Sequence, residues 1–149
     1  DWPSIMLLAN LQLRRDVNQA TKSYEQVLSL QPENFVALNN LAYFYLQKSQ
    51  LDKAQDYAKR ALTQQPRHAD VLDTLAQILI EKSDYRQALE HLSIAVEDKS
   101  VKEEIYLNYI EALLLNKQIA LAKRKIEQRK FKMPGSIEKI SSLKNQYKL

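Results

Sequence analysis

The sequence repeats the same arrangement of residues four times, with a period of 34. When it is divided before residues 1, 35, 69 and 103, one position holds alanine in every row: Ala20, Ala54, Ala88 and Ala122. Another position holds Pro32, Pro66, Ser100 and Pro134. Periods of about 20–50 residues are typical of repeat proteins, whose units pack only against their neighbours. The period therefore predicts an elongated stack of similar units.

Each row encodes two amphipathic helices. The first carries apolar residues at i, i+3, i+4 and i+7, a helical stripe that comprises Leu7, Leu8 and Leu11 in the first row and Leu41, Ala42 and Tyr45 in the second. The recurrent alanine indicates two helix backbones in close approach, where a larger side chain would overpack. The proline ends the second helix. We expect helices at 3–14, 18–30, 34–47, 51–64, 68–81, 85–97, 103–115 and 119–130.

A ninth helix is expected after Pro134 and Gly135, with Ile137, Ile140, Lys144 and Tyr147 on one face. Its apolar side would cover the last unit, because terminal units of a repeat array otherwise expose their stacking face. The third row lacks its proline, so we expect a looser junction there. The fold class is an all-α, right-handed solenoid of four helix hairpins plus a capping helix. The expected units are 1–34, 35–68, 69–102 and 103–136, with the cap at 137–149.

Composition argues against an enzyme. The single glycine cannot build a phosphate-binding loop, and the absence of cysteine excludes thiolate metal sites and a cysteine nucleophile. His68 and His91 have no second histidine at ligand spacing, so we interpret both as lone surface residues. We expect no catalytic residues, no cofactor and no metal. No apolar run approaches the ~20 residues of a membrane span, so no transmembrane segment is expected.

Charge is unevenly distributed along the chain. Residues 1–116 hold 12 basic and 16 acidic residues, whereas residues 117–149 hold 10 basic and 2 acidic ones. This basic end offers an alternative function, in which it binds a polyanion such as nucleic acid, an anionic polysaccharide or a membrane surface. Nucleic acid is the less favoured of these, because few aromatic platforms lie nearby. The candidate basic patch comprises Lys123, Arg124, Arg129, Lys130 and Lys132.

The period, the alanine of the second helix, the aromatic or aliphatic residue at Tyr24 and its equivalents, and the proline resemble the tetratricopeptide repeat (TPR) family from about residue 3 to residue 136. The family's first-helix tryptophan is replaced by Ser4, Leu38, Leu72 and Tyr106, and its glycine by Leu8, Ala42, Ala76 and Ile110. These departures concern packing detail. The resemblance implies a non-catalytic scaffold that binds a protein or peptide partner.

Some phrases, such as "NNLAYFYLQ" and "VLDTLAQILIEKSDYRQAL", weakly resemble the last repeats of bacterial TPR proteins associated with PEP-CTERM and exopolysaccharide export. That resemblance implies a periplasmic location, with the cytoplasm as the alternative. Because the pattern is already in register at Asp1, we expect the chain to be part of a longer bacterial protein. An excised first unit would expose an apolar face with Trp2, Ile5 and Leu8, so a homo-oligomer through the N-terminal repeat is a further expectation.

The TPR resemblance places a partner-binding groove on the first helices. In the first row the family's groove positions fall on Trp2, Ile5, Ala9, Gln12 and Leu13. In later rows the candidate groove residues are Asn39, Asn40, Tyr43, Asp70, Asp73, Gln77, Glu81, Asn108 and Glu111. Asparagine side chains suit an extended peptide backbone, tyrosine offers a rigid contact, and carboxylates favour a basic segment. The alternative is that these residues are ordinary solvated helix faces.

Some members of the family bind the C-terminal tails of the Hsp90 and Hsp70 chaperones through a clamp of lysine, arginine and asparagine side chains. The corresponding positions of this sequence hold Ile5, Ala9, Asn40, Asp70 and Thr74. Only Asn40 fits that clamp. Without the cations, little would hold a terminal carboxylate, so we expect no such binding.

Overall fold

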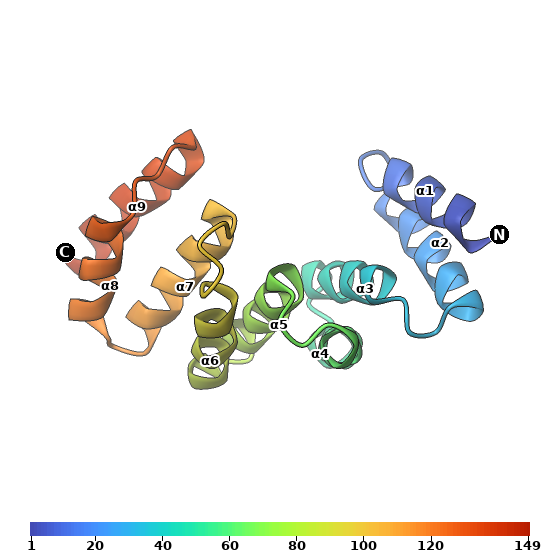
Figure 1. The fold of residues 1–149 in the computed structure, drawn as a ribbon, viewed down its shortest axis with the longest axis horizontal. Coiled ribbons are helices and arrows are strands. Elements are labelled where there is room, and N and C mark those ends of the chain that lie inside the picture. Colours follow the sequence, from blue (N-terminus) through green and yellow to red (C-terminus); the bar gives the residue numbers. More distant parts are fainter.

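The computed structural model describes all residues, 1–149, and consists of nine α-helices without a strand. The helices form successive hairpins in an extended arc, with the two termini at opposite ends (Figure 1). This confirms the all-α solenoid. The helices are α1 (Trp2–Gln12), α2 (Val17–Leu30), α3 (Phe35–Gln47), α4 (Leu51–Gln64), α5 (Ala69–Glu81), α6 (Tyr85–Ala95), α7 (Glu103–Leu115), α8 (Ile119–Gln128) and α9 (Pro134–Tyr147).

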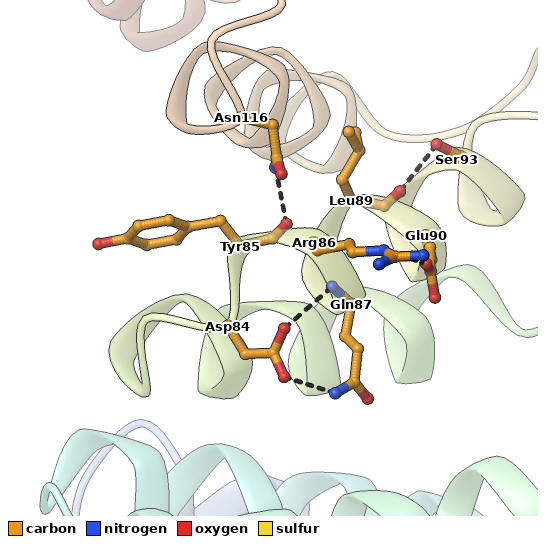
Figure 2. Close-up of polar contacts among 8 residues, drawn as sticks. All are labelled: Asp84, Tyr85, Arg86, Gln87, Leu89, Glu90, Ser93 and Asn116. Atoms are coloured by element: carbon orange, nitrogen blue, oxygen red, sulfur yellow. Dashed lines mark hydrogen bonds and ion pairs between the residues drawn. The ribbon is translucent and has the colours of Figure 1, made fainter.

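The boundaries of α1 to α8 lie within two residues of the expected ones, and local sequence signals explain several of them. Short polar side chains cap several N-termini: Asp16 accepts from Asn18 N and Gln19 N, and Asn34 accepts from Ala37 N. Figure 2 shows the same role for Asp84, whose carboxylate accepts from the backbone N–H of Gln87 at the start of α6. The division into units at 34, 68, 102 and 136 stays our interpretation.

The turns inside the second, third and fourth hairpins each contain a residue in the left-handed backbone conformation, which the low glycine content does not suggest. Ser49, Ser83 and Lys117 have positive φ values of 56°, 62° and 60°. Glycine adopts this left-handed conformation without a steric penalty, but none of the three residues is glycine. The turn between α1 and α2 contains no positive-φ residue and is one residue longer, spanning residues 13–16.

The unusual first turn changes which face of α1 is packed. Trp2, Ile5, Met6 and Ala9 pack on the core, at the same relative spacing as Leu38, Leu41, Ala42 and Tyr45, which follow them by 36 positions. The repeat period is 34, so α1 is displaced by two residues relative to the period. Trp2 thereby occupies the place that the period assigns to Ser4.

Two expectations for the first row are therefore wrong. Leu7, Leu8 and Leu11 were expected to pack, but 62%, 49% and 63% of their respective surfaces are exposed. Ala9 was expected in the groove but is fully buried, and Trp2 and Ile5 are partly buried against the core. The physical reason is the longer turn before α2, which carries no left-handed residue and so lets the helix present a different face.

The core is continuous along the solenoid. The four period alanines, Ala20, Ala54, Ala88 and Ala122, are fully buried, as close backbone approach requires. The paired helices α3–α4 and α5–α6 pack most extensively, while α2, α4 and α6 each pack against the helix that follows. In addition α3 packs against α5, α5 against α7, and α7 against α9. The first helices of the second, third and fourth units, α3, α5 and α7, therefore form one layer, and α9 continues that layer.

The junction without proline is longer than the others but is well anchored. Residues 96–102 link α6 to α7, and Val101 is 6% exposed. Arg129 Nη2 donates to Val101 O at 2.7 Å, and the Arg129 guanidinium lies 4.3 Å from the ring centroid of Tyr106. Figure 2 shows a further anchor, in which Asn116 Nδ2 donates to Tyr85 O at 2.7 Å. The link is therefore longer than the others, as expected, but it is held in place by these contacts.

The cap formed by α9 packs through a face that matches the expected one only in part: Ile140 is buried and Tyr147 packs against the core, as expected. Ser136, Ile140 and Leu143 are buried, whereas Ile137 is 53% exposed. The buried residues follow i, i+4, i+7 spacing, and Ile137 lies one position off this stripe. Lys139 of α9 forms an ion pair with Glu111 of α7, with 3.2 Å between Nζ and Oε2.

Candidate functional site

The layer formed by α3, α5 and α7 contains a hollow of about 540 Å³. Residues of all three helices line it, together with His68 and Lys102 from the links between units. Polar residues lie here because each of these helices is amphipathic, with its polar face opposite the packed apolar stripe. The candidate residues that line this hollow are Asn39, Asn40, Tyr43, Asp70, Asp73 and Gln77.

A second hollow, of about 360 Å³, continues from the first because Gln77 lines both. Leu46 and Ile80 supply apolar wall. The remaining candidate residues, Glu81, Asn108 and Glu111, line this second hollow. We refer to the two hollows together as the groove. All nine candidate groove residues thus lie on one continuous surface, whose binding role stays a prediction.

Asp73 is the most constrained polar residue of the groove. It is 7% exposed, and each carboxylate oxygen accepts one hydrogen bond, from Asn108 Nδ2 at 2.8 Å and from Gln77 Nε2 at 2.7 Å. Burial raises the pKa of Asp73, the two amide donors oppose this, and repulsion from Glu104 and Asp70 adds to the rise. The amides therefore hold a carboxylate that would otherwise be costly to bury.

The other groove carboxylates are closer to solvent. Asp70 Oδ1 lies 2.6 Å from Lys102 Nζ, and the side chains are 42% and 67% exposed respectively. Glu104 is exposed and lines the first hollow without forming an ion pair. With Glu81 and Glu111, these groups give the α5 and α7 side of the groove an acidic character, whereas the α3 side presents Val36 and Tyr43, 38% and 43% exposed.

Two buried polar atoms of residues beside the first hollow lack a hydrogen-bond partner, Asn39 Oδ1 and His68 Nδ1. His68 is not the surface residue that the sequence suggested. Its ring is half-buried and packs against Phe35, with 5.2 Å between the ring centroids. Phe35, His68 and Lys102 were missed as groove residues because helix-face reasoning neglects the links and the first residue of a helix. The sequence signal that could have identified them is their position at, or directly before, the N-terminus of a groove helix.

His91 is also half-buried, and burial lowers its pKa. No group of three or more His, Asp or Glu side chains has an arrangement that could hold a metal ion. None of the nine helices combines the length and the apolar character that a membrane-crossing segment requires.

The structure divides the candidate basic patch. Lys123, Arg124, Lys130 and Lys132 are exposed. Arg129 instead donates to Val101 O and stacks its guanidinium on the ring of Tyr106, so it contributes to packing within the fold and not to the exposed patch. The backbone N–H groups of Lys132 and Met133 donate to Glu103, and these bonds lower the pKa of that carboxyl.

The stacked hairpins and the groove on their first helices define an α-solenoid repeat protein. The model of the family described as the TT21 fifth ARM repeats domain matches residues 3–114, and the chain belongs to this family of helical repeats. No curated protein sequence matches the chain.

Solved TPR structures share the fold. A structure from work on the functional characterization of Pseudomonas aeruginosa pilF has a TM-score of 0.84 at 22% identity, over 99% of this chain and 69% of that one. YrrB, described as a TPR protein with an unusual peptide-binding site, has a TM-score of 0.72 at 21% identity, over 84% of this chain and 65% of that one. The TPR resemblance is thereby confirmed at the level of the fold.

A Thermobaculum terrenum O-GlcNAc transferase mutant also matches, with a TM-score of 0.71 at 20% identity. The match covers 75% of this chain but only 22% of the transferase. At this identity the likeness concerns the helical repeats alone. The resemblance to PEP-CTERM-associated repeats receives no support from these comparisons.

Proposed function

We propose that the chain is a non-catalytic interaction module that binds a partner peptide in the groove across α3, α5 and α7. One observation carries the proposal: all nine polar groove candidates, from three successive helices, line one continuous pair of hollows. The peptide-binding site described for YrrB, a protein of the same fold, is consistent with this use.

The chemistry of the groove favours a particular peptide. Tyr43 and Val36 would pack against an aliphatic or aromatic side chain of the partner. The exposed carboxylate of Glu104 favours a lysine or arginine further along the peptide. Asn40 would bond its backbone, since its amide offers both donors and an acceptor, and Asn39 would donate through Nδ2, because its Oδ1 is buried. The partner is therefore an extended segment with an apolar end and a basic end.

A random peptide display library, selected on the whole chain, tests this proposal. Enriched peptides are then measured by fluorescence anisotropy at about 0.15 M salt, where exposed long-range charge effects are largely screened. The groove variant replaces Asn39, Tyr43 and Glu104 by alanine; none of the three is buried. The control variant replaces Gln26, Lys59 and Glu90, which are exposed on α2, α4 and α6.

We expect peptides that combine apolar and basic residues, and a loss of at least about 10-fold in affinity for the groove variant, as for central contacts of an interface. The control variant should bind like the wild type. Equal affinity of both variants for every enriched peptide would remove the groove from consideration.

The basic end supports a second candidate, binding of a polyanion. Its specific observation is that Lys123, Arg124, Lys130 and Lys132 are exposed and form no side-chain ion pair. Dextran sulfate and single-stranded DNA serve as probes. Binding that falls steeply with salt, and falls again when Lys123 and Arg124 become alanine, would support this candidate. Binding that ignores both changes would reject it.

A further inference from the structure

The link between α6 and α7 borders a third hollow, of about 410 Å³, which the groove does not include. Its lining residues come from the start of α5, the end of α6, the link itself and the start of α7. Four of them, His68, Asp70, Lys102 and Ile105, also line the first hollow of the groove. The third hollow therefore adjoins the groove, and we refer to it as the link hollow.

The link hollow arises because α6 ends early. The helix ends at Ala95, three residues before Asp98, which corresponds by the period of 34 to Gln64 at the end of α4. Asp98 Oδ1 accepts hydrogen bonds from the backbone N–H of Ser100 at 2.8 Å and from its hydroxyl at 2.7 Å. Such a local turn competes with helix formation for the backbone. The unwound turn leaves room beside the end of α6, where Val101 is 6% exposed.

The wall of the link hollow is apolar. Ala95, Val101 and Ile105 are 2%, 6% and 3% exposed, and they line the hollow together with Ala69 and Ile94, which are partly buried against the core. Apolar side chains around a hollow favour an apolar occupant, because its burial removes further apolar surface from water.

The charged side chains at the rim already have partners. Arg67 forms an ion pair with Glu97, and Lys102 Nζ lies 2.6 Å from Asp70 Oδ1. The carboxylate of Asp98 is engaged by the turn within the link. The rim thus offers little unpaired charge to a ligand, and burying a charged group without a partner is costly. An uncharged apolar side chain is the occupant that fits.

We propose, resting on the function proposed for the groove, that the bound peptide continues over the Asp70–Lys102 ion pair and inserts a second apolar side chain, of leucine or phenylalanine size, into the link hollow. The path from Val36 and Tyr43 on α3 to the link hollow beside α5 and α7 crosses one to two helix spacings of about 10 Å. An extended chain advances about 3.3 Å per residue. The two apolar residues of the peptide should therefore lie about 3–6 positions apart.

Methyl NMR of the full chain, titrated with a peptide enriched in the display selection, tests whether both sites are occupied. Val36 reports on the groove, Ile94 and Val101 report on the link hollow, and Ile119 of α8, 38% exposed, is the control. We expect the signals of Val36, Ile94 and Val101 to shift with one binding curve, while that of Ile119 stays unchanged. Shifts at Val36 alone would overturn the continuation and leave the groove in place. Shifts at Ile94 and Val101 alone would reject both the groove and the continuation.

Filling the link hollow provides a second test. Ala69→Leu places a larger apolar side chain at its wall, and Ala69→Ser is a matched control of nearly unchanged size. Fluorescence anisotropy should show about 10-fold weaker peptide binding for Ala69→Leu, the scale expected for losing the burial of one apolar side chain, and wild-type binding for Ala69→Ser. Circular dichroism verifies that both variants keep the fold.

A change in the peptide completes the comparison. Replacing its second apolar residue by alanine should weaken binding to the wild type about 10-fold but weaken binding to Ala69→Leu much less, because the two changes remove the same contact. Equal weakening in both proteins would overturn the continuation. If the groove variant loses affinity while Ala69→Leu binds like the wild type, the groove stands and the continuation fails.

Discussion

Asn108→Ala isolates the energetic role of the buried carboxylate in the groove. Asn108 Nδ2 donates to Asp73 Oδ1 at 2.8 Å, and Asp73 is only 7% exposed, so water cannot fully replace the lost donor. A hydrogen bond to a charged group contributes about 1.5–3 kcal/mol, and we expect a loss of about 2 kcal/mol in the free energy of unfolding at pH 7. For a chain of this length, that corresponds to a fall of about 4–8 °C in Tm.

The loss should depend on pH in a defined direction. Burial raises the pKa of Asp73, so ionising this carboxyl subtracts stability as pH rises through that raised pKa. Asn108 stabilises the ionised form, and its removal therefore costs most above the pKa. At pH values below that raised pKa the protonated carboxyl makes a neutral hydrogen bond, and the cost should shrink to about 1 kcal/mol.

Thermal unfolding followed by circular dichroism at several pH values measures both effects. The matched control is Asn116→Ala, because Asn116 donates to the backbone carbonyl of Tyr85 (Figure 2) and to that of Ala112, and to no carboxylate. Its cost should stay constant between about pH 4 and pH 7, since no acceptor titrates. A pH-independent cost for Asn108→Ala, or the same pH dependence in the control, would refute the reasoning about Asp73.

Three further predictions concern the fold. Ser83→Gly should raise the free energy of unfolding by about 0.5 kcal/mol because φ is 62°, whereas Arg15→Gly should lower it; urea unfolding midpoints compare them. Ala88→Leu should cost about 1–3 kcal/mol by overpacking a fully buried site, and an unchanged thermal midpoint would show unfilled space there. Arg129→Ala should cost about 1–2 kcal/mol in urea unfolding through its bond to Val101 and its contact with Tyr106, while Lys130→Ala should change stability by less than about 0.5 kcal/mol. If Arg129→Ala and Lys130→Ala changed stability equally, Arg129 would have to be counted with the exposed residues of the basic patch.

Much of the fold was predictable because its signals are local. The apolar stripe of α3 and the alanine of α4 recur with the period and place the helices correctly. The TPR resemblance implied the groove positions on each first helix, and the candidates from Asn39 to Glu111 line the two hollows. The links escaped this reasoning, since the placement of His68 and Lys102 beside the groove depends on how one hairpin packs on the next.

The sequence by itself determined the repeated helix pairs, the capping helix and the uneven charge, because hydrophobic periodicity, proline positions and composition act over short stretches of chain. Only the tertiary structure decided which face of α1 is packed, that Arg129 is withdrawn from the basic surface, and that Asp73 is buried between two amides. The residues in these contacts are up to 35 positions apart. Their energies depend on the geometry of neighbouring hairpins, which a one-dimensional period does not specify.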